Sequence, residues 1–478
     1  MLTLNRRQFI STVACAALVS RSRILAGETA KRPNILIIFS DQISFDALSS
    51  TIGNRYINTP NLDALRARSM YFSRAYAANP LCVPSRTSMF TGRYPVETGI
   101  ETNDTAEGKS DDGERDPDPA KFPCMATLFR DAGYRTAYFG KWHLPYPNTE
   151  QAARINGFDH MATEIVDVDT ADHVNEFLSQ PHDAPFFAVA SFLNPHNICE
   201  WARGQKLNQG AIGEPPPADQ CPPLRANHGI MKDEPEIMGI MRRAYHNSPM
   251  FPVGGWDDAK WRQYEWAYYR LVERVDSLIG KVTKHLAERK LDENTLVLFT
   301  GDHGDCQGAH FFNQKTVLFE EAARVPFMIS YPARIKPGTS DMLMNTGVDI
   351  LPTLCDFAGI TPTTVVRGES LLPVATGRVR HANRRFVVTS DHMVQGGPVD
   401  GKYYRPEGRM VRTDRFKYCV YSEGENRESL VDLVNDPGEM VNLANDPKYL
   451  HTLNEHREIL NRWGTELKDN FPYVSVEA

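Results

Sequence analysis

The fold is indicated first by residues 34–41, which read NILIIFSD in one-letter code. An unbroken run of aliphatic and aromatic side chains ends there in a serine and a carboxylate, Asp41. Strands that are buried on both faces have this continuous apolar pattern, whereas half-buried strands alternate apolar and polar residues. The stretch therefore predicts a central strand of a parallel sheet, with Asp41 at its carboxyl end.

Three later stretches repeat this design. Apolar runs at 136–139, 185–193 and 296–300 each lead directly into polar residues. These polar residues include Lys141, His143, Asn194, His196, Asp302, His303 and Asp305. Open α/β sheets form their binding sites at the carboxyl ends of their strands. We therefore expect the polar side chains to meet in one site.

Other patterns complete the main domain. Residues 261–290 carry aromatic and aliphatic side chains at helical spacing, which predicts a long helix packed on the core. Stretches 101–120 and 203–235 are expected to be long surface loops, of the kind that form substrate-binding rims. We predict an α/β catalytic domain at 31–375, with a large, mostly parallel sheet flanked by helices.

The pattern changes after residue 375. Short strand-like runs at 385–390, 409–413 and 416–421 are separated by turns. An amphipathic stretch at 450–463 follows and predicts a closing helix. We predict a C-terminal subdomain at 376–478, made of a smaller antiparallel sheet plus a helix.

Length and composition exclude some classes of protein. A chain of 478 residues suits a large α/β domain with a smaller partner, and 41% hydrophobic residues suffice for a core. The formal net charge of -7 is opposite to the basic excess of proteins that bind nucleic acid. After residue 30 no apolar run is long enough to span a bilayer, so we expect no membrane anchor.

The N-terminus has the pattern of a targeting segment. Arg6 and Arg7 precede a short apolar run at 13–19, which predicts a cleaved twin-arginine-type signal peptide at 1–30. Cys15 lies inside the apolar run rather than at its end, which favours cleavage over lipidation. We therefore expect a periplasmic or secreted protein, with the twin-arginine export machinery as a partner.

The remaining cysteines give little evidence of disulfides. An oxidising compartment permits them, and Cys199 and Cys221, which flank a Pro-rich loop, are the one candidate pair. No CxxC motif or His/Cys cluster indicates a zinc site. Cys306 follows Asp305, and we interpret it as packing.

The polar residues after the strands suggest a cation and an anion. Asp41, Asp302 and His303, with Gln42 as a further ligand, suit a hard divalent ion such as Ca²⁺ or Mg²⁺; Asp41 as a helix N-cap is the alternative. A second group would surround the metal with positive charge and proton carriers: Arg86, Lys141, Lys315, His143 and His196. Such a site suits a small, highly charged anion, either a sulfate or a phosphate ester.

Cys82 has the neighbours of a reactive thiol. Cys82 and Arg86 are four residues apart, so on a helix they share one face. A thiol beside a guanidinium is in an electropositive setting, which favours the thiolate. The alternative is a small buried cysteine that only packs.

The same stretch carries a resemblance to a known family. Residues 82–86, CVPSR, with Thr91-Gly92-Arg93, are similar to the signature of the formylglycine-dependent (type I) sulfatases, of the alkaline-phosphatase-like superfamily. The resemblance covers nearly the whole mature chain, with motifs in the right order. The further matching stretches are 34–42, 140–144, 194–196, 301–304, 308–310 with Lys315, and 432–443.

The resemblance implies a modified residue and a bound cation. Cys82 would be oxidised to formylglycine by a maturation enzyme and then hydrated. The cation, Ca²⁺ or alternatively Mg²⁺, would be held by Asp41, Gln42, residue 82, Asp302 and His303. His310 is implied either as a further substrate contact or as a residue that touches only the groups supporting the site.

The resemblance also implies a mechanism. One hydroxyl of the hydrated residue 82 would attack sulfur while the metal, Arg86, Lys141 and Lys315 hold the sulfate oxygens. His196, together with Lys315, would help the leaving alcohol depart. His143 would accept the proton of the second hydroxyl, so that the covalent sulfate is expelled and the aldehyde re-forms.

Two positions depart from the pattern of many relatives. Gln42 stands where a second Asp is common, and His303 where Asn is common; both variants occur in the family. The leading hypothesis is a sulfatase acting on sulfated carbohydrate. A phosphonate monoester or phosphodiester hydrolase is the first alternative, and an inactive carbohydrate-binding relative is the second.

Overall fold

The computed structural model describes residues 32–103, 118, 120–163, 166–380 and 384–476. The predicted signal peptide at 1–30, with Cys15, therefore lies outside the described residues, as does most of the predicted rim loop at 101–120. Among the helices that the structure describes, none combines the length and the apolar character needed to cross a bilayer.

The centre of the large sheet is β1 (Asn34–Ser40), all of whose residues are buried. It pairs in parallel with β5 (Phe186–Phe192) on one side and with β6 (Thr295–Gly301) on the other. Beyond β5 lies β3 (Arg135–Gly140), again parallel. The continuous apolar runs therefore form neighbouring buried strands, as predicted, and their carboxyl ends lie at one edge.

Within the part of the chain that the structure describes, the sheet contains nine strands, in the order β4-β3-β5-β1-β6-β8-β2-β7, with β9 beside β2. Its other strands are β2 (Met70–Tyr76), β4 (His160–Ala162), β7 (Arg324–Val325), β8 (Phe327–Ser330) and β9 (Gly338–Asn345). β8 runs antiparallel to both β6 and β2, and β7 runs antiparallel to β2. The parallel character thus holds from β4 to β6, and the half beyond β6 is mixed.

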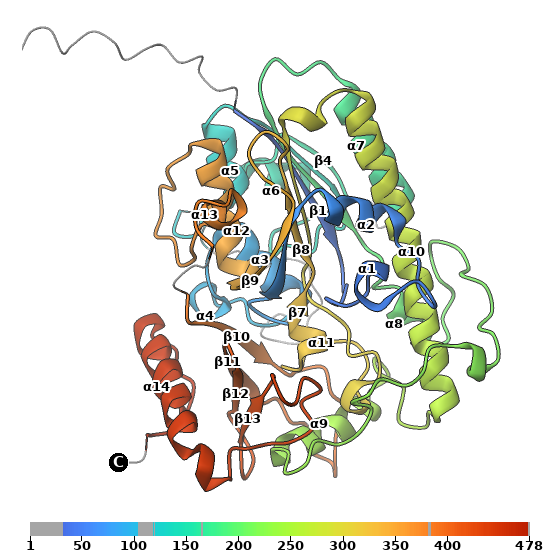
Figure 1. The fold of residues 1–478 in the computed structure, drawn as a ribbon, viewed down its shortest axis with the longest axis vertical. Coiled ribbons are helices and arrows are strands. Elements are labelled where there is room, and N and C mark those ends of the chain that lie inside the picture. The colour runs from blue at the N-terminus through green and yellow to red at the C-terminus, as the bar shows by residue number, and fades with distance from the viewer. Residues whose placement is uncertain (1–31, 104–117, 119, 164–165, 381–383, 477–478) are drawn as a thin grey trace, which may run out of the picture.

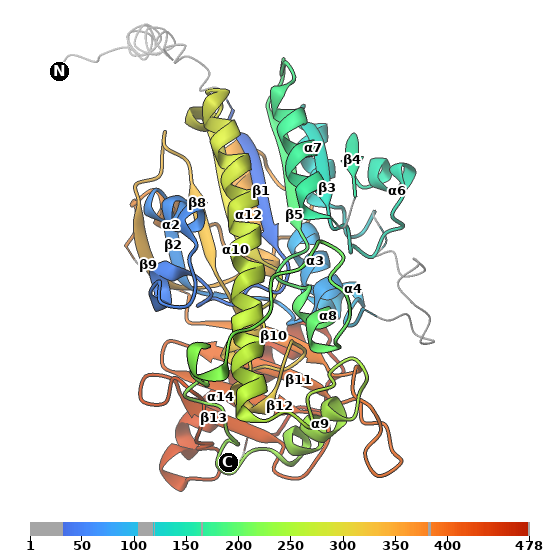
Figure 2. The ribbon, with the colours of Figure 1, turned by 90° about the vertical axis from the view of Figure 1, so that its right-hand side faces the viewer.

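Helices cover both faces of this sheet (Figures 1 and 2). Ile35, Ile37 and Phe39 of β1 pack into one core with α3 (Cys82–Thr91), α5 (Met125–Asp131) and α12 (Thr346–Ala358). Leu36 and Ile38, which point the other way, pack into a second core with α7 (Asp167–Ser179) and α10 (Asp258–Glu288). Helix α10 confirms the helix predicted at 261–290; it begins after Asp257, whose side chain accepts a hydrogen bond from the Lys260 N–H.

Short helices fill the connections. The α-helices are α1 (Ser49–Ile52), α2 (Pro60–Ala67), α4 (Pro95–Thr98), α6 (Glu150–Ile155), α8 (Ile198–Ala202), α9 (Glu236–His246), α11 (Glu320–Ala323) and α13 (Leu372–Ala375). The 3₁₀ turns are η1 (Ala218–Gln220), η2 (Asp292–Asn294), η3 (Ala309–Phe311) and η4 (Pro447–Tyr449). The stretch predicted as a loop at 203–235 contains η1 as its one helical turn.

A second, four-stranded sheet forms the lower part of the molecule in Figure 1. It is antiparallel and runs β10 (Phe386–His392), β11 (Glu407–Thr413), β12 (Phe416–Tyr421), β13 (Glu428–Asp432). Helix α14 (Leu450–Leu467) packs on one face through Leu453, Leu460 and Trp463. The predicted small antiparallel sheet with a helix is therefore confirmed, while the boundary at 375/376 stays a prediction.

The second sheet contacts the segment that leads into α3. The Ser390 N–H of β10 donates to the Ala78 carbonyl at 2.9 Å, and the Thr389 hydroxyl donates to the Ala77 carbonyl at 2.7 Å. These bonds link the C-terminal sheet to the chain only a few residues before Cys82.

The prediction of a Cys199–Cys221 disulfide is wrong, because both thiols are free. Cys199 Sγ lies 3.1 Å from Gln314 Oε1, whereas Cys221 Sγ lies 3.6 Å from the Pro216 carbonyl. The two side chains thus contact different parts of the structure, although both border the same loop in sequence. Cys306 is buried in an apolar cluster with residues such as Phe312 and Leu318, which confirms its interpretation as packing.

The buried carboxyl group of Asp391 in β10 should make the stability of the protein depend on pH. Its side chain is fully buried, and neither carboxylate oxygen makes a well-formed hydrogen bond to a described residue. Burial raises the pKa of this carboxyl from 3.8 to about 7, although the His392 N–H and the charge of Arg409 oppose the shift. The folded state therefore resists ionisation, so stability is lost as pH rises from about 4 to about 7, by roughly 4 kcal/mol at most.

We expect Asp391→Asn to remove this dependence on pH. Between about pH 5 and about pH 8 the variant should lose less free energy of unfolding in urea than the wild type. Asp183→Asn, at an exposed position, is the control and should behave as the wild type. Parallel profiles for the wild type and Asp391→Asn would contradict the prediction.

Candidate active site

Helix α3 presents the predicted signature at its first turn. Cys82 is its first residue and Arg86 lies one turn later; both side chains are completely buried. The Ser85 hydroxyl ties this turn to β6 by donating to the Asp302 carbonyl at 2.6 Å. The helix ends at Gly92, which adopts the left-handed conformation that a glycine accepts without strain.

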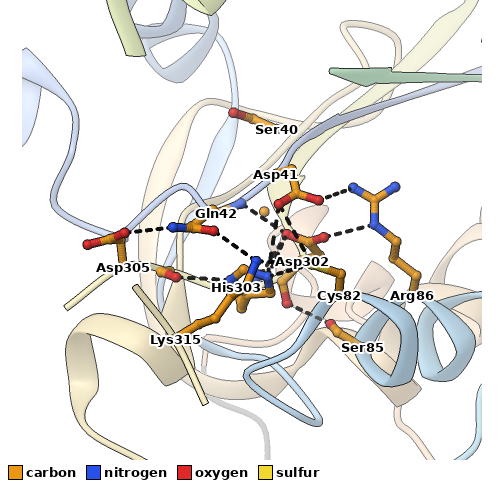
Figure 3. A network of polar contacts seen from close by, with 12 residues as sticks. Ser40, Asp41, Gln42, Cys82, Ser85, Arg86, Asp302, His303, Asp305 and Lys315 are labelled. Carbon is orange, nitrogen blue, oxygen red and sulfur yellow. Dashed lines mark hydrogen bonds and ion pairs between the residues drawn. The ribbon is translucent and has the colours of Figure 1, made fainter. Parts of the chain in front are cut away.

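The polar residues that follow the strands meet around Cys82 (Figure 3). Asp41 follows β1, Lys141 follows β3, and Asp302 and His303 follow β6. His143 and His196 lie close to Cys82, near enough to influence its titration or to have their own pKa changed by it. The structure thus brings together side chains that are far apart in sequence, because strands β3, β5, β1 and β6 are neighbours in the sheet.

Arg86 connects the two aspartates. Its Nη2 lies 2.9 Å from Asp41 Oδ2, and its Nε lies 2.8 Å from Asp302 Oδ2. Its Nη1 donates to the Ser191 hydroxyl at 2.8 Å and to the Lys141 carbonyl at 3.1 Å. Each nitrogen of the guanidinium therefore has at least one protein acceptor, as a buried charge requires, and the group orients the aspartates.

The second oxygens of the aspartates face a common centre. Asp41 Oδ1 lies 4.0 Å from His303 Nε2 and 3.9 Å from Cys82 Sγ, and Asp302 Oδ1 lies 3.8 Å from His303 Nε2. His303 Nδ1 lies 2.9 Å from the Gly304 carbonyl, so Nδ1 carries a proton and Nε2 is the nitrogen that faces the common centre. Ligand atoms of Asp41, Cys82, Asp302 and His303 all lie within 4.8 Å of one another. These converging oxygen and nitrogen atoms fit a divalent cation.

Two ammonium groups flank Cys82. Lys315 Nζ lies 3.2 Å from Cys82 Sγ and donates to Gln42 Oε1 at 2.8 Å. Lys141 Nζ lies 4.0 Å from the same sulfur and 2.7 Å from Asp41 Oδ2. This concentration of positive charge beside residue 82 suits an anionic group with several oxygens.

The charges determine the protonation of the site. Burial alone would raise the pKa of Cys82, but Lys141, Lys315 and His303 hold it well below its ordinary value. Burial, followed by Lys141 and Lys315, lowers the pKa of His196 to about 4, so this imidazole is neutral near pH 7. Burial would lower the pKa of Lys315, yet Cys82 and other neighbours raise it, so the ammonium stays charged.

His310 lies in a different cluster. Its ring stacks on Phe319 with 3.7 Å between centroids, and its carbonyl accepts from Arg242 Nε at 2.9 Å. A ring nitrogen of His310 also lies within 4.8 Å of a carboxylate oxygen of Glu321 and of Glu439. Within the described residues, none of these contacts involves the groups around Cys82, so its role as a substrate contact stays a prediction.

Several functional partners were missed by sequence reasoning. Ser191 and Tyr138, which contact Arg86, lie inside apolar strands where they resemble packing residues. Asp167 accepts the N–H groups of Leu193 and Asn194 and so holds the turn that carries His196. Asp305 was expected among the polar residues of the site, but its contact with the Gln42 side chain was not predicted.

Comparison with known proteins agrees with this geometry. Residues 33–360 match the family model described as Sulfatase, and residues 308–465 match that of the N-sulphoglucosamine sulphohydrolase C-terminal region. The chain is 30% identical to a Delta 4,5-hexuronate-2-O-sulfatase of Bacteroides thetaiotaomicron, covering 95% of this chain and 93% of that protein. It is also 30% identical to an ulvan-active sulfatase of Formosa agariphila, covering 92% and 82%.

A solved structure described as a 2-O GAG sulfatase superposes with a TM-score of 0.79 at 29% identity, covering 94% of this chain and 95% of that one. The family model spans more than half of the chain, and the first relative matches it over nearly its whole length. The chain therefore belongs to the sulfatase family and is a sulfuric ester hydrolase.

Proposed function

We propose that the protein is an exported sulfatase that releases sulfate from sulfated carbohydrate. The observation that carries the proposal is the cluster around Cys82, in which two aspartates, three cationic side chains and His303 are buried and the half-buried His143 and His196 lie close by. The names of the relatives support a carbohydrate, since they include a hexuronate 2-O-sulfatase and an ulvan-active sulfatase. The Arg6-Arg7 pattern supports export.

Formylglycine at position 82 and a divalent cation complete the proposed site. Asp41, Gln42, residue 82, Asp302 and His303 would hold the cation, Ca²⁺ or Mg²⁺. When both groups are present, they supply a hydroxyl nucleophile on residue 82 and a positive charge for a sulfate oxygen.

The lysines would bind the sulfate. Lys141 Nζ lies 4.0 Å from the Sγ atom of residue 82, and Lys315 Nζ lies 3.2 Å from it. Both ammonium groups can therefore contact the oxygens of a sulfate that approaches this residue. In a buried site such charges stabilise an anion far more than in water. Arg86 donates to both Asp41 and Asp302 and so would position them, and its positive charge would add to the hold on the sulfate oxygens.

The histidines and Lys315 would move protons. His143, close to residue 82, is placed to accept a proton from it. His196 is neutral, so it can hold the ester oxygen by a hydrogen bond while the charged Lys315 gives that oxygen a proton. Retention of these groups argues against an inactive carbohydrate-binding relative.

The substrate class can be tested by direct comparison. We expect the purified enzyme to hydrolyse a 2-O-sulfated unsaturated hexuronate with a higher kcat/KM than a phosphodiester or a phosphonate monoester of similar size. N-acetylglucosamine 6-O-sulfate serves as a second sugar sulfate. A preference for the phosphodiester or the phosphonate would contradict the proposal.

Lys315→Met should remove charge from the site without disturbing the fold, because Lys315 forms no ion pair with a described carboxylate. We expect kcat/KM for a sulfate ester to fall by roughly 10²–10³-fold. The melting temperature should stay close to that of the wild type.

Lys281→Met is the matched control, since Lys281 forms an exposed pair with Asp172. Its activity should equal that of the wild type. Wild-type kcat/KM in Lys315→Met would show that this ammonium does not act on the substrate.

A further inference from the structure

The side chain of Gln42 lies between a cation and a carboxylate. Its Oε1 accepts from Lys315 Nζ at 2.8 Å, and its Nε2 donates to Asp305 Oδ2 at 2.7 Å. A primary amide has one accepting and one donating end. Reversing it would place N–H groups against the ammonium and an oxygen against the carboxylate, so both contacts would become repulsive. Cys199 Sγ, 3.6 Å from both ends, can donate or accept and favours neither orientation.

The backbone of Gln42 is fixed separately. Its N–H donates to Asp302 Oδ1 at 3.1 Å, and its carbonyl accepts from the Tyr268 hydroxyl at 2.8 Å. The residue adopts a left-handed conformation with φ of 68°, and its side chain is completely buried. Rotation of the terminal amide is therefore the freedom that remains, and a buried amide needs partners at both ends.

Asp305 is held in place by donors other than Gln42. Its Oδ1 accepts from the Gln307 N–H at 2.7 Å, and its Oδ2 accepts from the Tyr264 hydroxyl at 3.0 Å. Its own N–H donates to the Ser44 hydroxyl at 2.9 Å. The carboxylate thus presents an acceptor to Gln42 whether or not anything is bound at the site.

We propose that Asp305 is the positioning residue for Gln42: it keeps Oε1, and not Nε2, directed towards Lys315 and the proposed cation site beside Asp302. The inference rests on the cation site of the proposed function and deepens it. It also gives a reason for an amide at position 42, because a carboxylate there would face Asp305 inside the protein, where two like charges repel strongly.

Asp305→Asn is a sharp test because an amide has only one oxygen. The Gln307 N–H is a backbone donor and cannot reverse, so the oxygen of the new amide must stay with it. The NH₂ group then faces Gln42, which has to turn its own oxygen towards it. Gln42 Nε2 would consequently point at Lys315 and the cation site, where a donor is unfavourable.

Adding Gln42→Glu to Asp305→Asn should restore the cation binding that Asp305→Asn weakens. In the double variant one oxygen of the new carboxylate accepts from the amide at 305, and the other faces Lys315 and the cation. In Gln42→Glu alone, the new carboxylate faces Asp305. Each single change should therefore weaken cation binding, and the two together should restore it, a coupling that a merely structural role would not produce.

The experiment is calcium titration of the purified full-length protein by calorimetry, with the calcium-induced shift in melting temperature as a second readout. We expect Asp305→Asn and Gln42→Glu each to raise the Kd for calcium at least about tenfold, and the double variant to bind within about threefold of the wild type. Asp183→Asn is the carboxylate-to-amide control and should bind as the wild type.

The outcomes that overturn the proposal differ from those that overturn the cation site. Wild-type affinity in Asp305→Asn, or a double variant that binds no better than the weaker single, would refute the role of Asp305 alone. A wild type that binds neither Ca²⁺ nor Mg²⁺ would overturn the cation site together with this inference. If Asp305→Asn does not fold, the double variant must still bind calcium more tightly than Gln42→Glu; otherwise the proposal is refuted.

Discussion

The buried ion pairs of Arg86 with Asp41 and Asp302 are the constraint on which the rest of the site depends. They join α3 to β1 and β6 at 2.9 and 2.8 Å, with all three side chains withdrawn from water. Two buried aspartates this close would otherwise repel each other, and removing the guanidinium would cost about 3–5 kcal/mol. Because Arg86 engages one oxygen of each carboxylate, the other oxygen of each is left to face His303 and Cys82.

The rest of the fold positions the strands, helix and loop that carry the side chains of the site. Parallel pairing of β1 with β5 and β6 places the carboxyl ends of these strands side by side, so that the polar residues that follow them share one site. The chain before Cys82 is also held by the second sheet, since groups of β10 donate hydrogen bonds to the carbonyls of Ala77 and Ala78. The Lys315 loop is linked to the same segment, because the Thr316 N–H donates to the Pro80 carbonyl at 3.1 Å. Helix α3 is thus held by both sheets and by the loop that carries Lys315.

Sequence reasoning predicted those parts of the molecule whose signals are local. Continuous apolar runs indicated β1, β3, β5 and β6, whereas β2, with its mixed composition, and the short strand β8 gave no comparable signal. The cluster around Cys82 was predicted because motif order identified its members. Contacts between distant residues could not be predicted in this way: the bonds from Arg86 to the Ser191 hydroxyl and the Lys141 carbonyl join segments far apart in sequence, while the role of Arg86 in holding sulfate stays a prediction. Likewise Tyr264 was interpreted as core, but its hydroxyl also donates to Asp305.

The central claim is that Cys82 is a precursor, and that the ammonium groups, histidines and aspartates around it serve the chemistry of its oxidised form. The most direct test is the mass of the peptide that contains residue 82, taken from catalytically active protein made in its native host. The account predicts that the –CH₂SH side chain has been replaced by an aldehyde, –CHO, or by its hydrate. Fully active enzyme in which residue 82 is unmodified cysteine throughout would contradict it.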